Sequence, residues 1–325
     1  MNRKSRMDAL MGIIGQERAV AVLRLALSSG NLHHAYLFMG PAGVGKKTAA
    51  RAFARAIILN DDPQGESYLR DDIHPDFMSI DILENKTQIS IEQVNREMEP
   101  WLAVKPFRAA HRVIIINNAH LLSLPAANAL LKTLEEPPPY AVIILVADEM
   151  MLLETIISRC QRLRFGLLSE KDLGDFLRQR GMESERASYL ARLAQGRVAT
   201  SIQLADIEGL EQQWQSAWEL INQLATGGEI AVFNCAEEIE KQPEIVTILL
   251  TTLLRDAYVY QSTHKPELLV VQDNAPIYEA FKPLNGKRVL DSLTHIEELR
   301  KKYRGPIRSI LLSINISYQL RDALQ

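Results

Sequence analysis

The chain has 325 residues, of which 47% are hydrophobic and 24% charged, and its formal net charge of −3 excludes a strongly basic protein that binds nucleic acid on its own. Cys160 and Cys235 are its two cysteines, which excludes a disulfide framework and a four-cysteine zinc site. Because no apolar run reaches the ~18 residues of a membrane span, and no apolar core follows the basic residues 1–6, we expect a cytoplasmic protein without membrane contact.

The first part of the chain alternates strand and helix signals. Residues 35–39 form a short apolar run that stops at Gly40, and the alanine-rich residues 46–58 that follow have helical spacing. Residues 113–116 and 142–146 are continuous β-branched runs. Such runs are typical of strands that are buried on both faces of a parallel sheet, so we expect these segments to share one sheet.

A helix is expected between the two β-branched runs. It covers residues 124–134, with Ser123 before it as an N-cap and Pro137 after it as a terminator. Strand, helix and strand at this spacing form a βαβ unit. We therefore predict an α/β domain with a parallel sheet over residues 1–166.

Beyond this domain the strand signals fade and helical periodicity takes over. Apolar-rich helices are expected at residues 245–260 and 307–320. We predict a small helical domain over residues 167–208 and an all-α domain over residues 209–325. We expect the second of these to serve packing or oligomerisation.

A glycine-rich loop lies between the run at residues 35–39 and the alanine-rich helix. Gly40, Gly43 and Gly45 let the backbone wrap closely around phosphate groups, and the N–H groups at the helix start point at the anion. Lys46 would reach the β- and γ-phosphates of a nucleotide. Strand, loop, lysine and helix together indicate a phosphate loop rather than a chance glycine-rich turn.

Three residues conflict with ATP hydrolysis at this loop. Lys47 stands where the Ser or Thr that holds Mg²⁺ is expected, and Thr48 comes one residue late, about 100° away around the helix. Asn117 and Asn118 replace the acidic pair that holds Mg²⁺ and polarises the attacking water. Loss of a general base alone lowers rates about 10²–10⁴-fold. We expect a degenerate site that requires no cofactor, while nucleotide binding itself stays open.

The sequence resembles the clamp-loader branch of the AAA+ ATPases, on several motifs together. Residues 126–138 (AANALLKTLEEPP) resemble the most characteristic segment of that branch, and residues 158–160 resemble its Ser-Arg-Cys motif. Residues 14–38 resemble the start of its ATPase subunits, and residues 74–76 its His-Pro-Asp motif. The resemblance covers about residues 12–165. It implies a P-loop AAA+ domain, a small helical lid domain and a helical collar domain.

The same resemblance implies a role for one arginine. Arg159 matches the arginine that the family offers in trans to the γ-phosphate on an adjacent subunit, where a guanidinium spreads the transition-state charge. It also implies a set of partners: gamma/tau-type and delta-type clamp-loader subunits, a sliding clamp, and primer–template DNA that the chain contacts through the assembled complex. A member with a degenerate loop would not hydrolyse ATP itself. The alternatives are a short gamma/tau-type subunit with its own ATPase activity and an AAA+-derived adaptor unrelated to replication.

The chain departs from the family pattern in three places. Residues 60–73 contain no cysteine where many relatives carry a four-cysteine zinc module, so we expect no zinc and no other metal. Residues 145–148 read Leu-Val-Ala-Asp, mostly apolar, where relatives end a strand with a polar sensor residue. At the second sensor position Thr200 aligns rather than Arg197, although a shift of one residue would change this.

Overall fold

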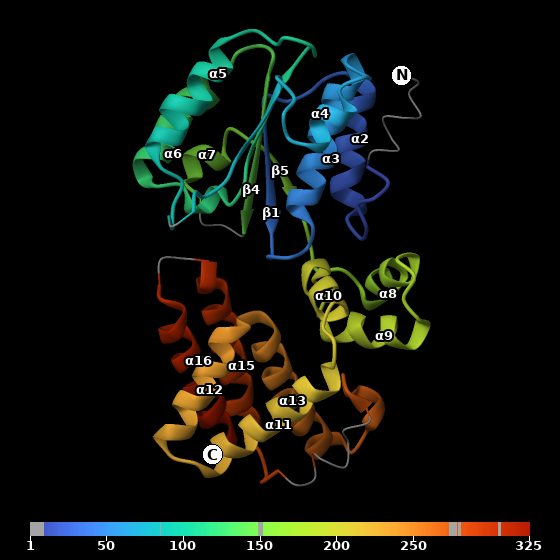
Figure 1. The fold of residues 1–325 in the computed structure, drawn as a ribbon, viewed down its shortest axis with the longest axis vertical. Helices are drawn as coiled ribbons and strands as arrows, with labels where there is room; N and C mark the ends of the chain where they lie inside the picture. The colour runs from blue at the N-terminus through green and yellow to red at the C-terminus, as the bar shows by residue number, and fades with distance from the viewer. Residues whose placement is uncertain (1–9, 85, 149–151, 273–277, 279–280, 305–306) are drawn as a thin grey trace. The chain divides into compact units, whose positions relative to one another are not determined.

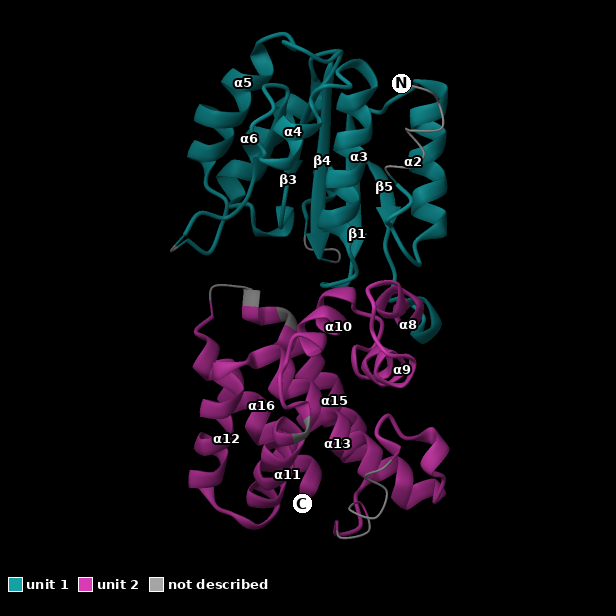
Figure 2. Ribbon diagram, turned by 45° about the vertical axis from the view of Figure 1, so that its right-hand side comes forward, with its two compact units in different colours: residues 1–172 teal, residues 173–325 magenta. Residues whose placement is uncertain are grey.

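The computed structural model describes residues 10–84, 86–148, 152–272, 278, 281–304 and 307–325. The chain divides into two compact units, residues 1–172 and residues 173–325 (Figure 2). The finer division of the helical part into a lid and a collar stays a prediction. Within the described residues, no helix combines the length and the apolar character needed to cross a bilayer.

Unit 1 is built on a parallel sheet. Its described strands are β1 (Ala35–Gly40), β2 (Phe77–Ile80), β3 (Arg112–Ile116), β4 (Ala141–Asp148) and β5 (Gln161–Arg164). They pair in the order β2-β3-β4-β1-β5, and each neighbouring pair is parallel. The strands predicted at residues 35–39, 113–116 and 142–146 are confirmed. Because all strands run the same way, their carboxyl ends lie along one edge of the sheet and their amino ends along the other.

Helices cover both faces of this sheet. The described ones are α2 (Glu17–Ser29), α3 (Lys46–Asp61), α4 (Glu66–Arg70), α5 (Glu99–Ala103), α6 (Leu124–Glu135) and α7 (Glu154–Ile157), with a π-helical turn at Gln93–Met98 and a 3₁₀ turn at Ala119–Leu121. Figure 1 shows α2, α3 and α4 on one face and α5, α6 and α7 on the other. The predicted cap of α6 is confirmed, because Ser123 Oγ accepts a hydrogen bond from the Ala126 N–H at 3.3 Å.

The central strands bury both of their faces. In β1, Leu37 packs in a cluster with Leu130 of α6, whereas its neighbour Tyr36 points to the opposite face. There the ring of Tyr36 meets Phe53 of α3, with the ring centroids 5.0 Å apart. A strand with helices on both sides has no polar face, and this explains why the central strands read as continuous apolar runs in the sequence.

Unit 2 is helical in its described residues. Its helices are α9 (Ser184–Leu193), α10 (Val198–Ala205), α11 (Leu210–Thr226), α12 (Glu229–Lys241), α13 (Pro243–Thr263), α15 (Gly286–Lys301) and α16 (Ser309–Leu324), and α8 (Glu170–Gln179) leads into them. The helix predicted at residues 245–260 lies within α13, and the one predicted at residues 307–320 corresponds to α16. On α15, Glu297 accepts hydrogen bonds from Arg197, which precedes α10, and from Arg300 at 2.9 Å.

Candidate functional site

The glycine-rich loop connects β1 to α3 at the carboxyl edge of the sheet. Gly43 and Gly45 have φ angles of 79° and 94°, a region that disfavours other residues. Gly40 has φ 148°, and a Cβ added there would lie 2.0 Å from the carbonyl oxygen of Phe165. The backbone therefore has the form that a phosphate loop requires, with the first N–H groups of α3 at its end.

The ammonium group of Lys46 contacts other residues of this chain. Its side chain is only 4% exposed, and Nζ lies 2.7 Å from Oδ1 of Asp148, the last residue of β4. The ammonium also donates to the carbonyl oxygens of Gly40 at 2.7 Å and Pro41 at 2.6 Å. An ammonium has three N–H donors, so these three contacts engage all of them. A phosphate group would have to displace at least one.

A second cation lies beside the loop. Lys47 Nζ is 3.0 Å from Oδ2 of Asp81, which directly follows β2. Asn117, which follows β3 and is 2% exposed, donates from Nδ2 to the same oxygen at 3.0 Å and to Ser79 Oγ at 3.1 Å. Four strands thus contribute to one polar edge, as expected for parallel strands, although the sequence pattern alone points to neither Asp81 nor Asp148 as part of it.

These residues do not fit a magnesium ion, which the fold family places here. Mg²⁺ prefers carboxylate, hydroxyl and water oxygens in octahedral geometry. At this edge Lys47 brings a positive charge and no oxygen, and the carboxylate of Asp81 is already paired with it. Asn118 offers an amide, and its backbone, with φ 51°, turns the chain into the 3₁₀ turn after β3. In the described residues, no group of three or more His, Cys, Asp or Glu side chains could hold a metal ion.

Arg159 lies at the opposite edge of the sheet. It precedes β5, whose first residue Gln161 is in register with Tyr36 near the start of β1, whereas the loop follows the end of β1. Its Nη1 donates to the carbonyl oxygen of Thr155 at 2.9 Å, and its Nη2 to Oε1 of Glu135 at 2.5 Å. The structure thus groups Gly40, Gly43, Gly45 and Lys46 in one loop and places Arg159 away from it.

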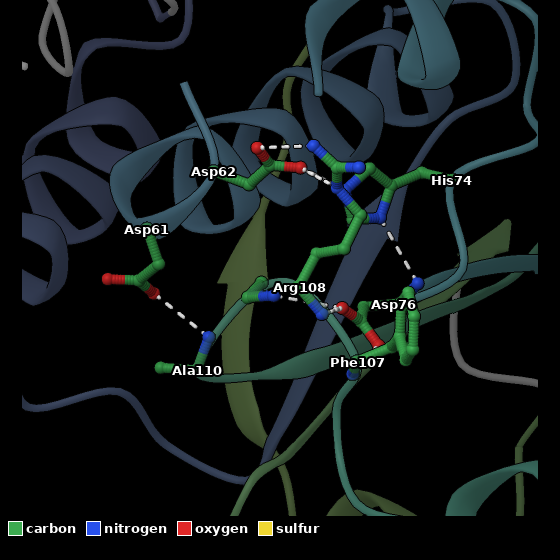
Figure 3. A network of polar contacts seen from close by, with 8 residues as sticks. Asp61, Asp62, His74, Asp76, Phe107, Arg108 and Ala110 are labelled. Atoms are coloured by element: carbon green, nitrogen blue, oxygen red, sulfur yellow. Dashed lines mark hydrogen bonds and ion pairs between the residues drawn. The ribbon is translucent and has the colours of Figure 1, made fainter. Parts of the chain in front are cut away.

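The His-Pro-Asp motif belongs to a polar network at the amino edge (Figure 3). Asp76 is fully buried and accepts hydrogen bonds from the backbone N–H groups of Phe107, Arg108 and Ala109 at 2.7, 2.6 and 2.9 Å. Its own N–H donates to Nδ1 of His74 at 3.1 Å. The motif therefore fixes the loop that leads into β3. The side chain of Phe107 at the tip of this loop is 81% exposed.

Asp62, just after α3, completes this network. It accepts a two-pronged contact from Arg108, with Nε at 2.5 Å and Nη2 at 3.1 Å, and a hydrogen bond from Nε2 of His74 at 3.1 Å. The Arg108 guanidinium, and after it His74, lower the pKa of the Asp62 carboxyl to about 2, against the opposing effect of burial. The network joins α3, the His-Pro-Asp motif and the loop before β3.

The two residues weighed for the second sensor position lie in unit 2. Thr200 is 1% exposed within α10, and Arg197 is paired with Glu297 of α15. Cys160, next to Arg159, packs against the core of unit 1, and burial raises the pKa of its thiol to about 12. A thiol with such a pKa is not a nucleophile at neutral pH.

A parallel sheet in this order, with a glycine-rich loop after β1 and helices on both faces, defines a P-loop domain of the AAA+ type. Residues 15–169 match the family described as DNA polymerase III, delta subunit. This part of the chain, just under half of it, is therefore similar to that family, and the proteins that the chain resembles in sequence include tau/gamma and gamma subunits of DNA polymerase III.

Two relatives and one structure describe this similarity. The DNA polymerase III subunit tau/gamma of Haemophilus influenzae is 34% identical over 216 residues, which cover 63% of this chain and only 31% of that protein. The subunit gamma of Buchnera aphidicola from Acyrthosiphon pisum is 28% identical over 82% of this chain and 72% of that protein. A gamma subunit-related protein of Thermotoga maritima has a TM-score of 0.41 at 18% identity, and covers 94% of this chain and 99% of that one.

Proposed function

We propose that this chain is a delta-prime-type subunit of the DNA polymerase III clamp loader. It assembles with gamma/tau-type and delta-type subunits in the cytoplasm and helps them place the sliding clamp on primer–template DNA. It does not hydrolyse ATP itself, and its loop requires neither zinc nor another cofactor. Its chemical contribution is Arg159, which it offers to the ATP site of an adjacent subunit.

One observation supports this proposal: the residues that bind Mg²⁺ in an ATPase site are replaced in this chain, whereas the arginine that would act on a neighbouring site is present. At the carboxyl edge, Lys47 and Asn117 stand where Mg²⁺ ligands belong, and Lys46 is engaged by Asp148. At the amino edge, Arg159 is kept on the surface beside Glu135. A guanidinium there cannot act on the chain's own loop, but it can stabilise developing negative charge on a neighbour.

The first experiment measures phosphate release by the isolated chain with Mg²⁺ and primed DNA. Because both the metal ligands and the general base are replaced, we expect no turnover above background. Turnover of about one per second, the low end of ordinary enzymes, that disappears in Lys46→Ala would contradict the proposal.

The second experiment uses the reconstituted loader with Arg159→Ala in this subunit. An arginine finger supplies about 10³–10⁵ in rate at a single site. Since only one of the loader's sites would be affected, total hydrolysis stimulated by clamp and DNA should fall by a smaller factor. Gel filtration must show normal assembly. Unchanged hydrolysis would disprove the finger, and lost assembly would make Arg159 an interface residue instead.

The names of the relatives favour a second candidate, a short gamma/tau-type subunit that hydrolyses ATP. Such a subunit would need Mg²⁺ to displace Lys47 from Asp81. The first experiment separates the two candidates, because only the gamma/tau-type subunit would show turnover without its partners.

A further inference from the structure

We infer that Glu135 is a positioning residue for Arg159, so that the carboxylate fixes the direction in which the guanidinium points from the surface of unit 1. This inference rests on the proposed function and adds a second residue to it. The pair joins the end of α6 to the segment after α7, two elements that are far apart in sequence and adjacent at the amino edge of the sheet.

The contacts hold the guanidinium from two sides. Nη1 donates to the carbonyl oxygen of Thr155 at 2.9 Å, and Nη2 donates to Oε1 of Glu135 at 2.5 Å. A guanidinium has five N–H donors in a fixed plane, so both contacts can persist while other N–H groups of Arg159 meet a phosphate oxygen. The carboxylate can therefore orient the arginine without removing it from use.

The backbone on both sides of the pair is anchored. Leu134, directly before Glu135, is 2% exposed, and Pro137 ends α6 two residues later. Ile157, two residues before Arg159, is 5% exposed and packs in the same core cluster as Leu134. A carboxylate on such a rigid frame restricts the rotamers of the arginine that it binds.

Helix energetics alone do not explain the carboxylate. Glu135 is the last residue of α6, where the helix dipole favours a cation and disfavours an anion. The pair is also open to water, with 34% of the Arg159 side chain and 51% of the Glu135 side chain exposed, so its contribution to stability is small. We expect the pair to affect the orientation of the Arg159 side chain rather than the stability of unit 1.

The test compares Glu135→Gln with the matched control Glu136→Gln in the reconstituted loader. The control removes the same charge one residue further along the chain. Loss of an exposed ion pair lowers the occupancy of one side-chain orientation by about 1.4- to fivefold. Glu135→Gln should therefore produce about three-tenths to four-fifths of the drop in kcat caused by Arg159→Ala. The KM for ATP and the melting temperature of the chain should stay unchanged, as should all values for Glu136→Gln.

The decisive readout is the double variant. If Glu135 acts through Arg159, Glu135→Gln should have no further effect in the Arg159→Ala background. A kcat equal to wild type or above it for Glu135→Gln, while Arg159→Ala lowers it, would overturn the positioning role and leave the proposed function intact. If Arg159→Ala itself has no effect, the proposed function fails and the positioning role falls with it.

Discussion

Replacing Asp148 by Asn removes the charge that binds the phosphate-loop lysine. Lys46 Nζ lies 2.7 Å from Asp148 Oδ1, and the two side chains are 4% and 24% exposed. At an effective dielectric constant of about 20, charges at this distance attract each other by about 6 kcal/mol, and desolvation of the two ions cancels several kcal/mol of this. Loss of one partner of a buried pair costs about 3–5 kcal/mol.

The expected effect is smaller than that range because the lysine keeps other partners. Lys46 still donates to the carbonyl oxygens of Gly40 and Pro41, and Asp148 reaches water on one side. We therefore expect Asp148→Asn to lower the free energy of unfolding of unit 1 by about 2 kcal/mol. The double variant Lys46→Met, Asp148→Asn should lower the free energy of unfolding by less than the sum of the two single changes, because it leaves no buried charge unpaired.

Tryptophan fluorescence in urea can follow unit 1 separately. Of the three tryptophans, Trp101 lies in unit 1, while Trp214 and Trp218 lie in unit 2. With both of the latter replaced by Phe, Trp101 reports the unfolding of unit 1. A loss below about 0.5 kcal/mol for Asp148→Asn, the size of an ordinary surface substitution, would refute the buried ion pair.

Three further predictions concern the frame of unit 1. Arg108 and His74 hold the pKa of the Asp62 carboxyl at about 2, below its ordinary 3.8. The ionised carboxylate therefore stabilises the fold above about pH 4, and this contribution is lost as the pH falls from about 4 to 2. In Asp62→Asn, this part of the pH dependence of the urea midpoint should vanish. Asp76→Ala leaves three loop N–H groups without their acceptor and should cost about 2–4 kcal/mol, with faster hydrogen exchange at residues 107–109. Gly40→Ala should cost more than about 2 kcal/mol in thermal unfolding because the new Cβ meets a carbonyl oxygen, whereas Gly12→Ala, with open space around it, should change little.

The sequence predicts the buried strands well and the edge strands poorly. β3 and β4 are covered on both faces, so nearly every position is apolar and the run is easily recognised. β5 reads Gln-Arg-Leu-Arg and buries only Leu163, because it forms an edge of the sheet and needs only one apolar side chain. Hydrophobic periodicity over four residues with one apolar member carries no strand signal.

In the candidate site, residues within a motif can be predicted from the sequence, whereas their partners that are distant in sequence cannot. Lys46, Lys47 and Asn117 stand at fixed distances from recognisable motifs, so their residue types can be interpreted locally. Their partners cannot, because Asp148 lies 102 residues from Lys46 and Asp81 lies 34 residues from Lys47. A signal was present, since each of these acids lies at the carboxyl end of a strand of the parallel sheet. Residues 145–148 read as mostly apolar, so Asp148 at their end was not recognised as a partner of Lys46.

The strand order also has a consequence for synthesis of the chain. Ala35 of β1 pairs with Ile143 of β4, and Tyr36 pairs with Gln161 of β5, so both neighbours of β1 lie more than one hundred residues further along. At a translation rate of about 5–20 residues per second, the apolar strand β1 leaves the ribosome roughly 5–20 s before either neighbour can bind it. During that interval its backbone and its side chains on both faces have no sheet to join. Until residues 141–164 have been made, β1 therefore stays exposed except where α3 can cover it, as Phe53 covers Tyr36 in the folded unit.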